Sequence, residues 1–401
     1  MSEILFLSHR PPFPPNKGEK IRAYHLLAGL CAQHRVHLGC LIDEDEDWRH
    51  TEHLQRLCAE TCFAPLRRST AGSALRALVN GEAVSIAHHR HPELAAWVRA
   101  TLQARRPSCA YVMSSAMAQF LDPTGFSPPR TILDFVDVDA EKWRLYAADS
   151  RWPFSWLYRR EAEQLLRHDR AAGQRFDLCL FVSEAEAGRF RALAPELGSK
   201  IRHLVNGVDA DYFSPGRDYP DPFDGGLAVV FTGTMSYRPN EEAAIWFARE
   251  VMPRLRQSVP SLRFAIVGRD PSRRLGALDG RDGVMLTGTV PDPRPYLAHA
   301  AAVVVPLLHS PGVANKVLEG MAMAKSVVAT PQAVSGLNLV DGRDTMIAAD
   351  AEAFVNALAK LLADGTPPSN LEARARVLAD FTWAAAIAEL MTLIQVPDAK
   401  D

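Results

Sequence analysis

The sequence predicts an α/β protein made of two doubly wound, Rossmann-like parallel-sheet domains, and two observations lead to this prediction. Short, solid runs of Val, Ile, Leu and Phe alternate along the chain with longer stretches of helical period. Strands buried on both faces have this composition, as in a parallel sheet covered by helices, and strand–helix alternation is typical of doubly wound units. The series is interrupted by a Gly-, Pro- and Asp-rich segment over residues 206–226, which is typical of an interdomain connection.

Apolar runs supply the candidate strands of both halves. Those of the first half are Ile4–Ser8, Val36–Ile42, Cys62–Pro65, Cys109–Met113, Thr131–Phe135 and Leu178–Ser183. Those of the second half are Ala228–Gly233, Arg263–Gly268, Val284–Thr287, Ala302–Pro306, Ser326–Thr330 and Thr345–Ala348.

The length of the chain sets the domain organisation. At roughly 100–200 residues per domain, 401 residues suggest two domains, and a hydrophobic content of 47% supplies two cores. We expect an N-terminal domain over 1–205, the connection over 206–226, a C-terminal domain over 227–380 and a final segment over 381–401. The final segment contains "FTWAAAIAELMTLIQV", which predicts an amphipathic helix whose apolar stripe needs a partner surface.

The composition excludes several classes of protein. A net charge of −2 argues against a nucleic-acid-binding protein, which is usually more basic. The six cysteines are scattered, without a Cys-x-x-Cys pair, as in reduced packing residues of a cytosolic protein. No segment resembles a signal peptide or a membrane span. We therefore expect a cytoplasmic protein, which could still rest against the cytoplasmic face of the inner membrane.

Charged residues in the second half stand where doubly wound sheets bind ligands, beyond the carboxyl ends of strands. The stretch "PGVANKVLEGMAMAKSVVAT" (311–330) follows a candidate strand and predicts a helix over roughly 314–324. Lys316 lies in its first turn and Glu319 one turn further, on the same face. With the free N–H groups of a helix start, Lys316 suits a diphosphate, and Glu319 suits sugar hydroxyls. The alternative is a weak surface ion pair, which the small apolar residues around the two charges disfavour, because a buried charge needs a partner.

A second loop of this half follows the strand Ala228–Gly233. Gly233 permits a tight turn, and Pro239 or Asn240 fits the start of the next helix. Arg238 is expected in the loop between them, where a guanidinium can bind a phosphate.

Two loops of the first half are further candidates. Gly18 follows the Pro-rich stretch "SHRPPFPPNKGEK" and offers a close backbone approach at a helix start; the alternative is a plain β–α connection. Asp137, in "DFVDVDAEKW", is expected at the carboxyl edge of the sheet. The alternatives for Asp137 are a helix N-cap and an Asp-x-Asp metal motif together with Asp139.

The segment "RWPFSWLYRREAEQLLRHDRAAGQRF" (151–176) carries aromatic residues beside arginines. This pattern can meet a membrane interface. It is also typical of a helix that packs on its own domain, with arginine stems covering apolar surface, and the sequence favours packing.

Taken together, these motifs resemble the retaining glycosyltransferases of family 4, which have the GT-B fold of two Rossmann-like domains facing a central cleft. "KVLEGMAMAKSVVAT" resembles their donor-binding helix and strand, and "LVNGVDADYFSP" (204–215) resembles the domain junction. "LFVSEAEAGRF" resembles the last unit of the first domain, and "FTWAAAIAELMTLI" the final helix, which returns to that domain. "DFVDVDAEKW" and "RPPFPPNKGEKIRAY" are similar to sugar transferases of exopolysaccharide and exosortase (PEP-CTERM) loci.

The resemblance implies roles for the residues around 311–319. Glu319 matches the second Glu of the family's Glu-x7-Glu pattern, which implies contact with the nucleoside part of the donor. Pro311 stands at the first Glu, so the pattern is incomplete. Lys316 matches a subgroup with Lys-x-x-Glu, and Gly312 matches the glycine whose backbone approaches the donor.

The resemblance also implies roles for residues outside this helix. Gly18 matches the glycine-rich first loop, Thr234 stands where many members have a phosphate-binding Arg, and Arg238 is its substitute by proximity. Asp137 stands where other members have a cleft-facing His. The candidate catalytic residues are Lys316, Asp137 and Arg238, and the candidate donor-binding residues are Glu319, Gly312, Val313, Asn315, Gly233 and Gly18; no metal site is expected.

The implied activity is transfer of a sugar, with retention, from a nucleotide-diphosphate donor to a glycan or lipid-linked acceptor in bacterial exopolysaccharide or cell-surface glycan synthesis. Preorganised cations and helix N–H groups stabilise a leaving diphosphate without a metal or cofactor. The alternatives are a nucleotide-sugar epimerase of the same fold and a non-catalytic nucleotide-sugar-binding partner. A nicotinamide dehydrogenase is disfavoured, because the Gly-x-Gly-x-x-Gly fingerprint is absent.

Overall fold

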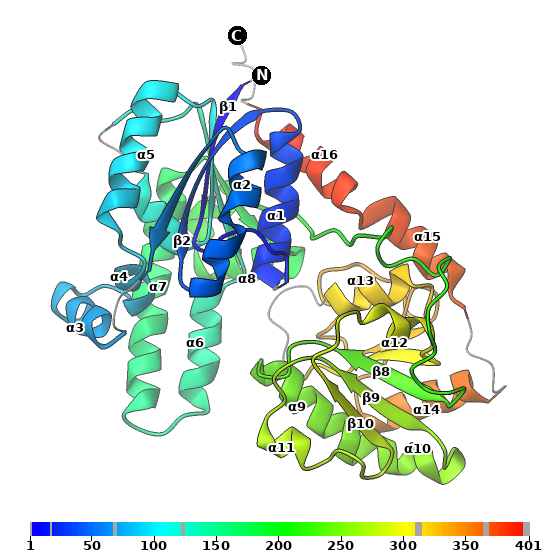
Figure 1. The fold of residues 1–401 in the computed structure, drawn as a ribbon. Helices are drawn as coiled ribbons and strands as arrows, with labels where there is room; N and C mark the ends of the chain where they lie inside the picture. Colours follow the sequence, from blue (N-terminus) through cyan, green and yellow to red (C-terminus); the bar gives the residue numbers. More distant parts are fainter. Residues whose placement is uncertain are drawn as a thin grey trace. The chain divides into compact units, whose positions relative to one another are not determined.

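A computed structural model of the chain describes residues 2–16, 18–66, 70–121, 125–308, 315–363 and 369–395 (Figure 1). Contacts divide the chain into two compact units, one of Met1–Val205 with Ala386–Asp401 and a second of Asn206–Ala385. Each unit holds a parallel sheet covered by helices, with seven strands in the first sheet and six in the second. The predicted fold class is therefore confirmed.

The sheet of the first unit has the strand order β3-β2-β1-β4-β5-β6-β7, and the order reverses between β1 and β4. Its strands are β1 (Glu3–Ser8), β2 (Arg35–Ile42), β3 (Glu60–Pro65), β4 (Cys109–Met113), β5 (Arg130–Val136), β6 (Leu178–Phe181) and β7 (Ile201–His203). The helices are α1 (Gly18–Cys31), η1 (Asp45–His50), α2 (Thr51–Leu57), α3 (Thr70–Asn80), α4 (Val84–His88), α5 (Pro92–Arg105), η2 (Ser115–Phe120), α6 (Asp139–Ala148), α7 (Phe154–Arg175), α8 (Glu184–Leu193) and η3 (Pro195–Lys200).

The sheet of the second unit has the order β10-β9-β8-β11-β12-β13, and the order reverses between β8 and β11. Its strands are β8 (Ala228–Thr232), β9 (Arg263–Val267), β10 (Val284–Gly288), β11 (Ala302–Val305), β12 (Val327–Ala329) and β13 (Met346–Ile347). The helices are α9 (Arg238–Trp246), η4 (Phe247–Val251, a π-helix), α10 (Met252–Ser258), α11 (Arg273–Gly276), α12 (Arg294–Ala298), α13 (Asn315–Ala322), α14 (Ala351–Leu362), α15 (Leu371–Asp380) and α16 (Trp383–Leu393), whose end belongs to the first unit.

Every predicted strand coincides with an observed one to within two residues at each end, because the central strands are solid apolar runs buried on both faces. The apolar runs of the sequence did not predict β7. This edge strand has three residues, Ile201–His203, of which only Ile201 is buried, so it has no apolar run to reveal it.

A buried charge network lies under the carboxyl end of the first sheet. The Arg22 guanidinium donates from Nε to Asp134 Oδ2 at 2.8 Å and from Nη1 to the Leu204 carbonyl at 2.8 Å. The Tyr111 hydroxyl also donates to Asp134, and burial beside this carboxylate raises the pKa of Tyr111. Each buried charge has a partner, as an apolar interior requires.

The end of α16 packs on α1 within the first unit. A Cβ on Gly29 would come within 2.6 Å of the Ile387 side chain, so glycine lets the two helices approach. Arg130 Nε donates to the Leu393 carbonyl at 2.9 Å and fixes the last turn of α16. The apolar stripe of the terminal helix therefore has a partner surface.

Candidate functional site

The candidate site of the second unit lies where its strand order reverses, between the neighbouring strands β8 and β11. In open α/β sheets, ligands bind beyond the carboxyl ends of the strands at such a reversal. Two loops leave this edge. One runs from β8 to α9, and the other runs from β11 to α13, over residues of which 309–314 lie outside the described part.

Glycines bring the ends of β8 and β9 into backbone contact. The Gly233 N–H donates to the Val267 carbonyl at 3.0 Å, and the Met235 N–H donates to the Arg269 carbonyl at 2.9 Å. A Cβ on Gly268 would lie 1.7 Å from the Gly233 carbonyl oxygen, a distance that no side chain tolerates. The turn at Gly233 therefore depends on glycine at 268.

Asn240 is the residue of this site that sequence reasoning missed. It is buried in the first turn of α9, and its Nδ2 donates to the Thr234 carbonyl at 2.9 Å, which closes the loop after β8. Its Oδ1 accepts a hydrogen bond from Lys316 Nζ at 2.7 Å. The sequence pattern indicates Asn240 only as a residue at a helix start. Its contact with Lys316, 76 positions away, is a tertiary contact that no local pattern predicts.

The Lys316 ammonium is held above the glycine turn. Its Nζ lies 4.9 Å from the centroid of the Phe231 ring, and a Cβ on Gly233 would come within 3.3 Å of it. Burial lowers the pKa of Lys316 to about 8, against the opposing effect of Glu319. A cation in the first turn of a helix also opposes the positive end of the helix dipole. Lys316 and the start of α13 together therefore form a site that an anion would stabilise.

Glu319 lies one turn further along α13 and is partly buried. No ion pair joins it to Lys316, and its carboxylate accepts no hydrogen bond anywhere in the described residues. Burial raises the pKa of Glu319, and the nearby Lys316 ammonium opposes this. The alternative of an i,i+3 ion pair is therefore wrong, and the carboxylate has its acceptor capacity available for a ligand.

The other predicted residues of the second unit lie at the starts of α9 and α13 or outside the described residues. Asn315 begins α13, and its Oδ1 accepts from Asn206 Nδ2 at 3.4 Å. Arg238 is the first residue of α9 rather than a loop residue, because Pro239 allows the helix to begin there. Its Nε donates to Glu242 Oε1 at 2.7 Å, so part of its charge is compensated on the same helix. Gly312 and Val313 lie outside the described residues, as does Pro311.

Asp137 lies in the first unit, directly after β5. The preceding residue, Val136, has φ of +69°, a left-handed conformation that is costly for a β-branched residue. The buried Oδ1 of Asp137 has no hydrogen-bond partner in the described residues. Burial, and then the charges of Glu186 and Asp139, raise the pKa of Asp137 to about 7.

Two alternative roles were open for Asp137, a helix N-cap and part of a metal motif. The residue at the N-cap of α6 is Val138, whose side chain makes no capping bond, so the N-cap alternative is wrong for Asp137. Within the described ranges, no group of three or more His, Cys, Asp or Glu residues has an arrangement that could hold a metal ion.

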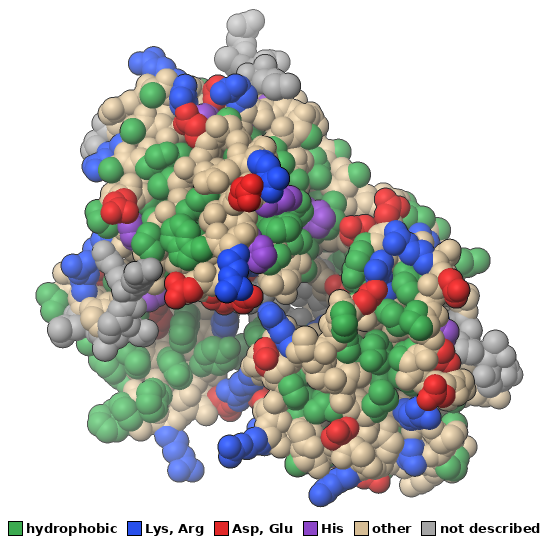
Figure 2. Space-filling model, viewed as in Figure 1, with side chains coloured by type: hydrophobic (Ala, Val, Ile, Leu, Met, Phe, Trp, Pro, Cys, Tyr) green, Lys and Arg blue, Asp and Glu red, His purple; other side chains and the backbone are tan. Residues whose placement is uncertain are grey.

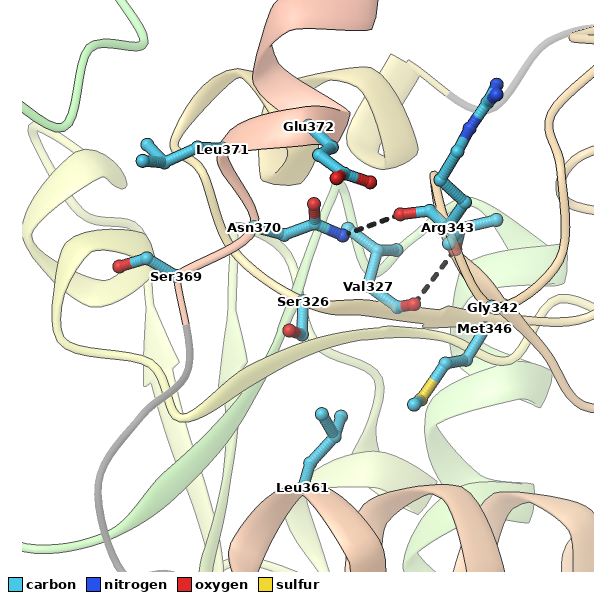
Figure 3. Close-up of a pocket in the computed structure, with 11 residues that line it drawn as sticks. Ser326, Val327, Gly342, Arg343, Met346, Leu361, Ser369, Asn370, Leu371 and Glu372 are labelled. Carbon is cyan, nitrogen blue, oxygen red and sulfur yellow. Dashed lines mark hydrogen bonds between the residues drawn. The ribbon is translucent and has the colours of Figure 1, made fainter.

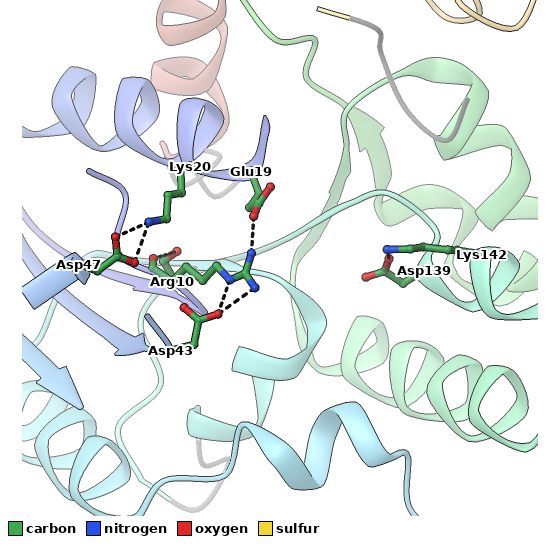
Figure 4. Close-up of polar contacts among 8 residues, drawn as sticks. Arg10, Glu19, Lys20, Asp43, Asp47, Asp139 and Lys142 are labelled. Carbon is green, nitrogen blue, oxygen red and sulfur yellow. Dashed lines mark hydrogen bonds and ion pairs between the residues drawn. The ribbon is translucent and has the colours of Figure 1, made fainter. Parts of the chain in front are cut away.

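Gly18 begins α1 in the first unit, and a Cβ there would meet nothing within 4 Å. Next to it, the Glu19 carboxylate accepts from Arg10 Nη1 at 2.7 Å, and the Arg10 guanidinium also binds Asp43 (Figure 4). The start of α1 therefore has a carboxylate of its own beside it, paired with an arginine. Lys20, one residue further, binds Asp47 at 2.7 Å and is buried.

A pocket of about 440 Å³ opens at the other edge of the second sheet, at the amino ends of β12 and β13 (Figure 3). Two polar side chains of its lining bond to backbone carbonyls of the lining: Asn370 Nδ2 donates to the Arg343 carbonyl at 3.0 Å, and Thr345 Oγ1 donates to the Val327 carbonyl at 2.8 Å. The pocket is thus distinct from the edge where Lys316 and Glu319 lie.

Comparisons with known proteins agree with this fold. Residues 226–364 match the family model described as Glycosyl transferases group 1. No curated protein matches the chain. Among solved structures, the sucrose-phosphate synthase of Thermosynechococcus elongatus has 16% identity and a TM-score of 0.69, with 98% of each chain covered.

Two further structures show the same fold. The HepE protein of Anabaena, solved in complex with UDP and glucose, has 14% identity and a TM-score of 0.66, with 98% of this chain and 99% of that chain covered. The α,α-trehalose 6-phosphate synthase of Burkholderia multivorans has 13% identity and a TM-score of 0.63, with 98% of each chain covered. The likeness to these structures thus shows a GT-B fold, and the match to the glycosyl transferase group 1 model is confined to residues 226–364.

Proposed function

We propose that this protein is a retaining glycosyltransferase that takes its sugar from a nucleoside-diphosphate donor bound to the second unit. The observation that carries the proposal is the Lys316 ammonium, which Asn240 holds at 2.7 Å over the Gly233 turn at the reversal of strand order. The family match over residues 226–364 supports it. Structures of HepE with UDP and with UDP-glucose make a UDP-sugar the first donor to test.

The proposed chemistry breaks the bond between the anomeric carbon and the diphosphate oxygen, and the acceptor oxygen bonds to that carbon on the face from which the diphosphate leaves, so that the anomeric configuration is retained. Negative charge develops on the leaving diphosphate. Lys316 and the N–H groups at the start of α13 stabilise this charge, and such preorganised groups act most strongly where water is excluded. We propose that they suffice without a metal ion, with Arg238 as a further cation from the start of α9.

Asp137 is proposed as the group that receives the acceptor proton. Its pKa of about 7 suits a general base near neutral pH. The acceptor is proposed to be a glycan or a lipid-linked glycan of exopolysaccharide synthesis, on the resemblance of "DFVDVDAEKW" and "RPPFPPNKGEKIRAY" to transferases of those loci.

The proposal is tested first by ligand-observed NMR of the full chain with UDP-, GDP- and ADP-sugars. We expect one donor class to bind, and its nucleoside diphosphate to be released slowly by hydrolysis without an acceptor. A changed sugar with the nucleotide still attached would identify an epimerase instead. Donor binding with neither hydrolysis nor transfer to added glycans would identify a non-catalytic binding protein.

Replacing Glu319 with alanine is expected to weaken donor binding about 10–100-fold, because the carboxylate accepts hydrogen bonds from donor hydroxyls and charged acceptors make strong bonds. The dissociation constant is measured by NMR titration with the donor that binds. Glu319→Gln, which keeps one acceptor oxygen, should lose less, and exposed Glu352→Ala should bind as wild type. Unchanged affinity in Glu319→Ala would contradict the assignment of this residue.

The pH dependence of kcat/KM for donor hydrolysis is expected to be bell-shaped, with limbs near pH 7 and pH 8. The ammonium form of Lys316 is the active form, and its pKa of about 8 means that this form is lost as the pH rises through 8. The carboxylate form of Asp137 is lost as the pH falls through about 7. Because kcat/KM reports groups of the free enzyme, Lys316→Arg should remove the alkaline limb and Asp137→Asn the acidic limb. Limbs that persist in both variants would refute these assignments.

A further inference from the structure

The helices α6 and α7 form a hairpin that extends beyond the sheet of the first unit (Figure 1). Part of α7 is anchored to the α3–α4 region. Arg160 donates to the carbonyls of Ala77 at 2.8 Å and Glu82 at 3.1 Å, and the Glu161 carboxylate accepts from the Val84 N–H at 2.7 Å. The tip of the hairpin, residues 145–158, lies beyond these anchors.

An aromatic cluster holds the two helices of the hairpin together. Trp143 lies 5.9 Å from Tyr146 and 5.5 Å from Tyr158, and Tyr146 lies 6.2 Å from Tyr158, as ring centroids. The hairpin therefore has its own packed interior. Of the remaining aromatic residues, Phe154 touches the edge of this cluster, with its ring centroid 6.3 Å from that of Tyr158, whereas Trp152 and Trp156 make no ring contact with any described residue.

These three aromatic residues and Leu145 of α6 are exposed to solvent. Trp152 is 82% exposed, Phe154 58%, Leu145 55% and Trp156 54%. The expectation that the aromatics of this segment pack on their own domain is therefore wrong for Trp152, Phe154 and Trp156, because the hairpin carries them past the body of the unit. Figure 2 shows hydrophobic side chains gathered over the α6–α7 hairpin.

The tip and the turn next to it carry a small excess of positive charge. Lys142 and Arg144, below the tip, are paired with Asp139 and Glu141, and Arg160 belongs to the anchors. Residues 145–159 contain two basic residues, Arg151 and Arg159, and one acid, Asp149. Arg151 and Arg159 are exposed, and neither forms an ion pair with any described residue. The tip and the turn next to it thus combine exposed aromatic rings with two exposed guanidinium groups that form no ion pair with a described residue.

We propose that this tip docks on the surface of an anionic lipid bilayer. Tryptophan and phenylalanine suit the boundary between headgroups and acyl chains, and arginine is attracted to anionic lipid phosphates. Phe154 and Trp156 are two positions apart on α7, so they point to nearly opposite sides of the helix. A fluid bilayer surrounds such a tip on all sides, whereas one flat protein surface reaches only one of the two rings. No helix among the described residues is long and apolar enough to cross a membrane, so the contact is a peripheral one.

The test is flotation of the full chain with phosphatidylcholine vesicles and with vesicles that also contain phosphatidylglycerol. Wild type is expected to float with the anionic vesicles and to be released by high salt. The triple variant Trp152→Ser, Phe154→Ser, Trp156→Ser should bind at least about tenfold more weakly, and Arg151→Gln with Arg159→Gln should lose the preference for anionic lipid. Trp48→Ser, which removes a tryptophan 38% exposed on η1, is the matched control and should float as wild type.

Three results would overturn the proposal. One is that the wild-type protein floats with neither kind of vesicle. Another is that the triple variant floats with the anionic vesicles as the wild-type protein does. The third is a wild-type dimer in sedimentation velocity that the triple variant abolishes, which would make a second copy of the chain the occupant of the tip. Circular dichroism melting confirms that the variants fold. Because donor binding is assigned to the second unit, the donor affinity of the triple variant should be unchanged, which separates this proposal from the proposed function.

Discussion

Replacing Lys316 with alanine is expected to lower donor turnover about 10²–10³-fold, the typical effect of removing one preorganised group that stabilises charge in the transition state. The ammonium is fixed by Asn240 at 2.7 Å and by the face of the Phe231 ring, so it does not have to reorganise as charge develops on the diphosphate. The measurement is the rate of nucleoside-diphosphate release at saturating donor, at pH 7. We expect kcat to fall more than donor affinity, because the charge is greatest in the transition state.

The controls for this variant separate chemistry from folding. Lys325 is also a partly buried lysine whose pKa burial lowers, but it lies at the amino end of β12, at the other edge of the sheet. Lys325→Ala should therefore turn over donor at the wild-type rate. A Lys316→Ala protein that folds normally and keeps its wild-type kcat would remove Lys316 from the mechanism and leave the helix start without its cation.

The strands other than β7 were predictable because burial on both faces leaves a local sequence signal, a run of apolar residues. The turn at Gly233 and the position of Lys316 in the first turn of a helix were predictable for a related reason, since loops that follow the strands of such sheets lead into helix starts. The role of Asn240 was not predictable, because it depends on a hydrogen bond to Lys316, which lies 76 positions away in the sequence. The buried pair of Arg22 and Asp134, 112 positions apart, was invisible for the same reason.

For the hairpin tip, the sequence pattern fits two interpretations and does not choose between them. Its aromatic and arginine pattern is compatible with packing and with a membrane interface. The choice depends on whether the domain reaches the rings. Only the arrangement of α6 and α7 shows that Trp143, Tyr146 and Tyr158 fill the hairpin interior while Trp152 remains exposed.

Replacing Gly268 with alanine is expected to lower the free energy of unfolding of the second unit by about 3 kcal/mol or more, as overpacking against immovable atoms does at its upper end. The new Cβ would stand 1.7 Å from the Gly233 carbonyl oxygen. The obstacle is backbone, so no side chain can rotate away, and the ends of β8 and β9 must separate. Denaturant unfolding of the full chain measures the loss. Gly276→Ala, in α11, meets nothing within 4 Å and should leave stability unchanged or slightly raised, since alanine favours a helix.

The same substitution also tests whether the donor site depends on this packing. Separating β8 from β9 breaks the bond from the Gly233 N–H to the Val267 carbonyl and moves the turn over which Lys316 is held. We therefore expect any Gly268→Ala protein that remains folded at low temperature to bind donor at least about tenfold more weakly, although residue 268 itself carries no side chain toward the ligand. If instead the variant loses stability but keeps wild-type donor affinity, the Gly233 turn does not position the diphosphate, and the donor site must be built from α13 alone.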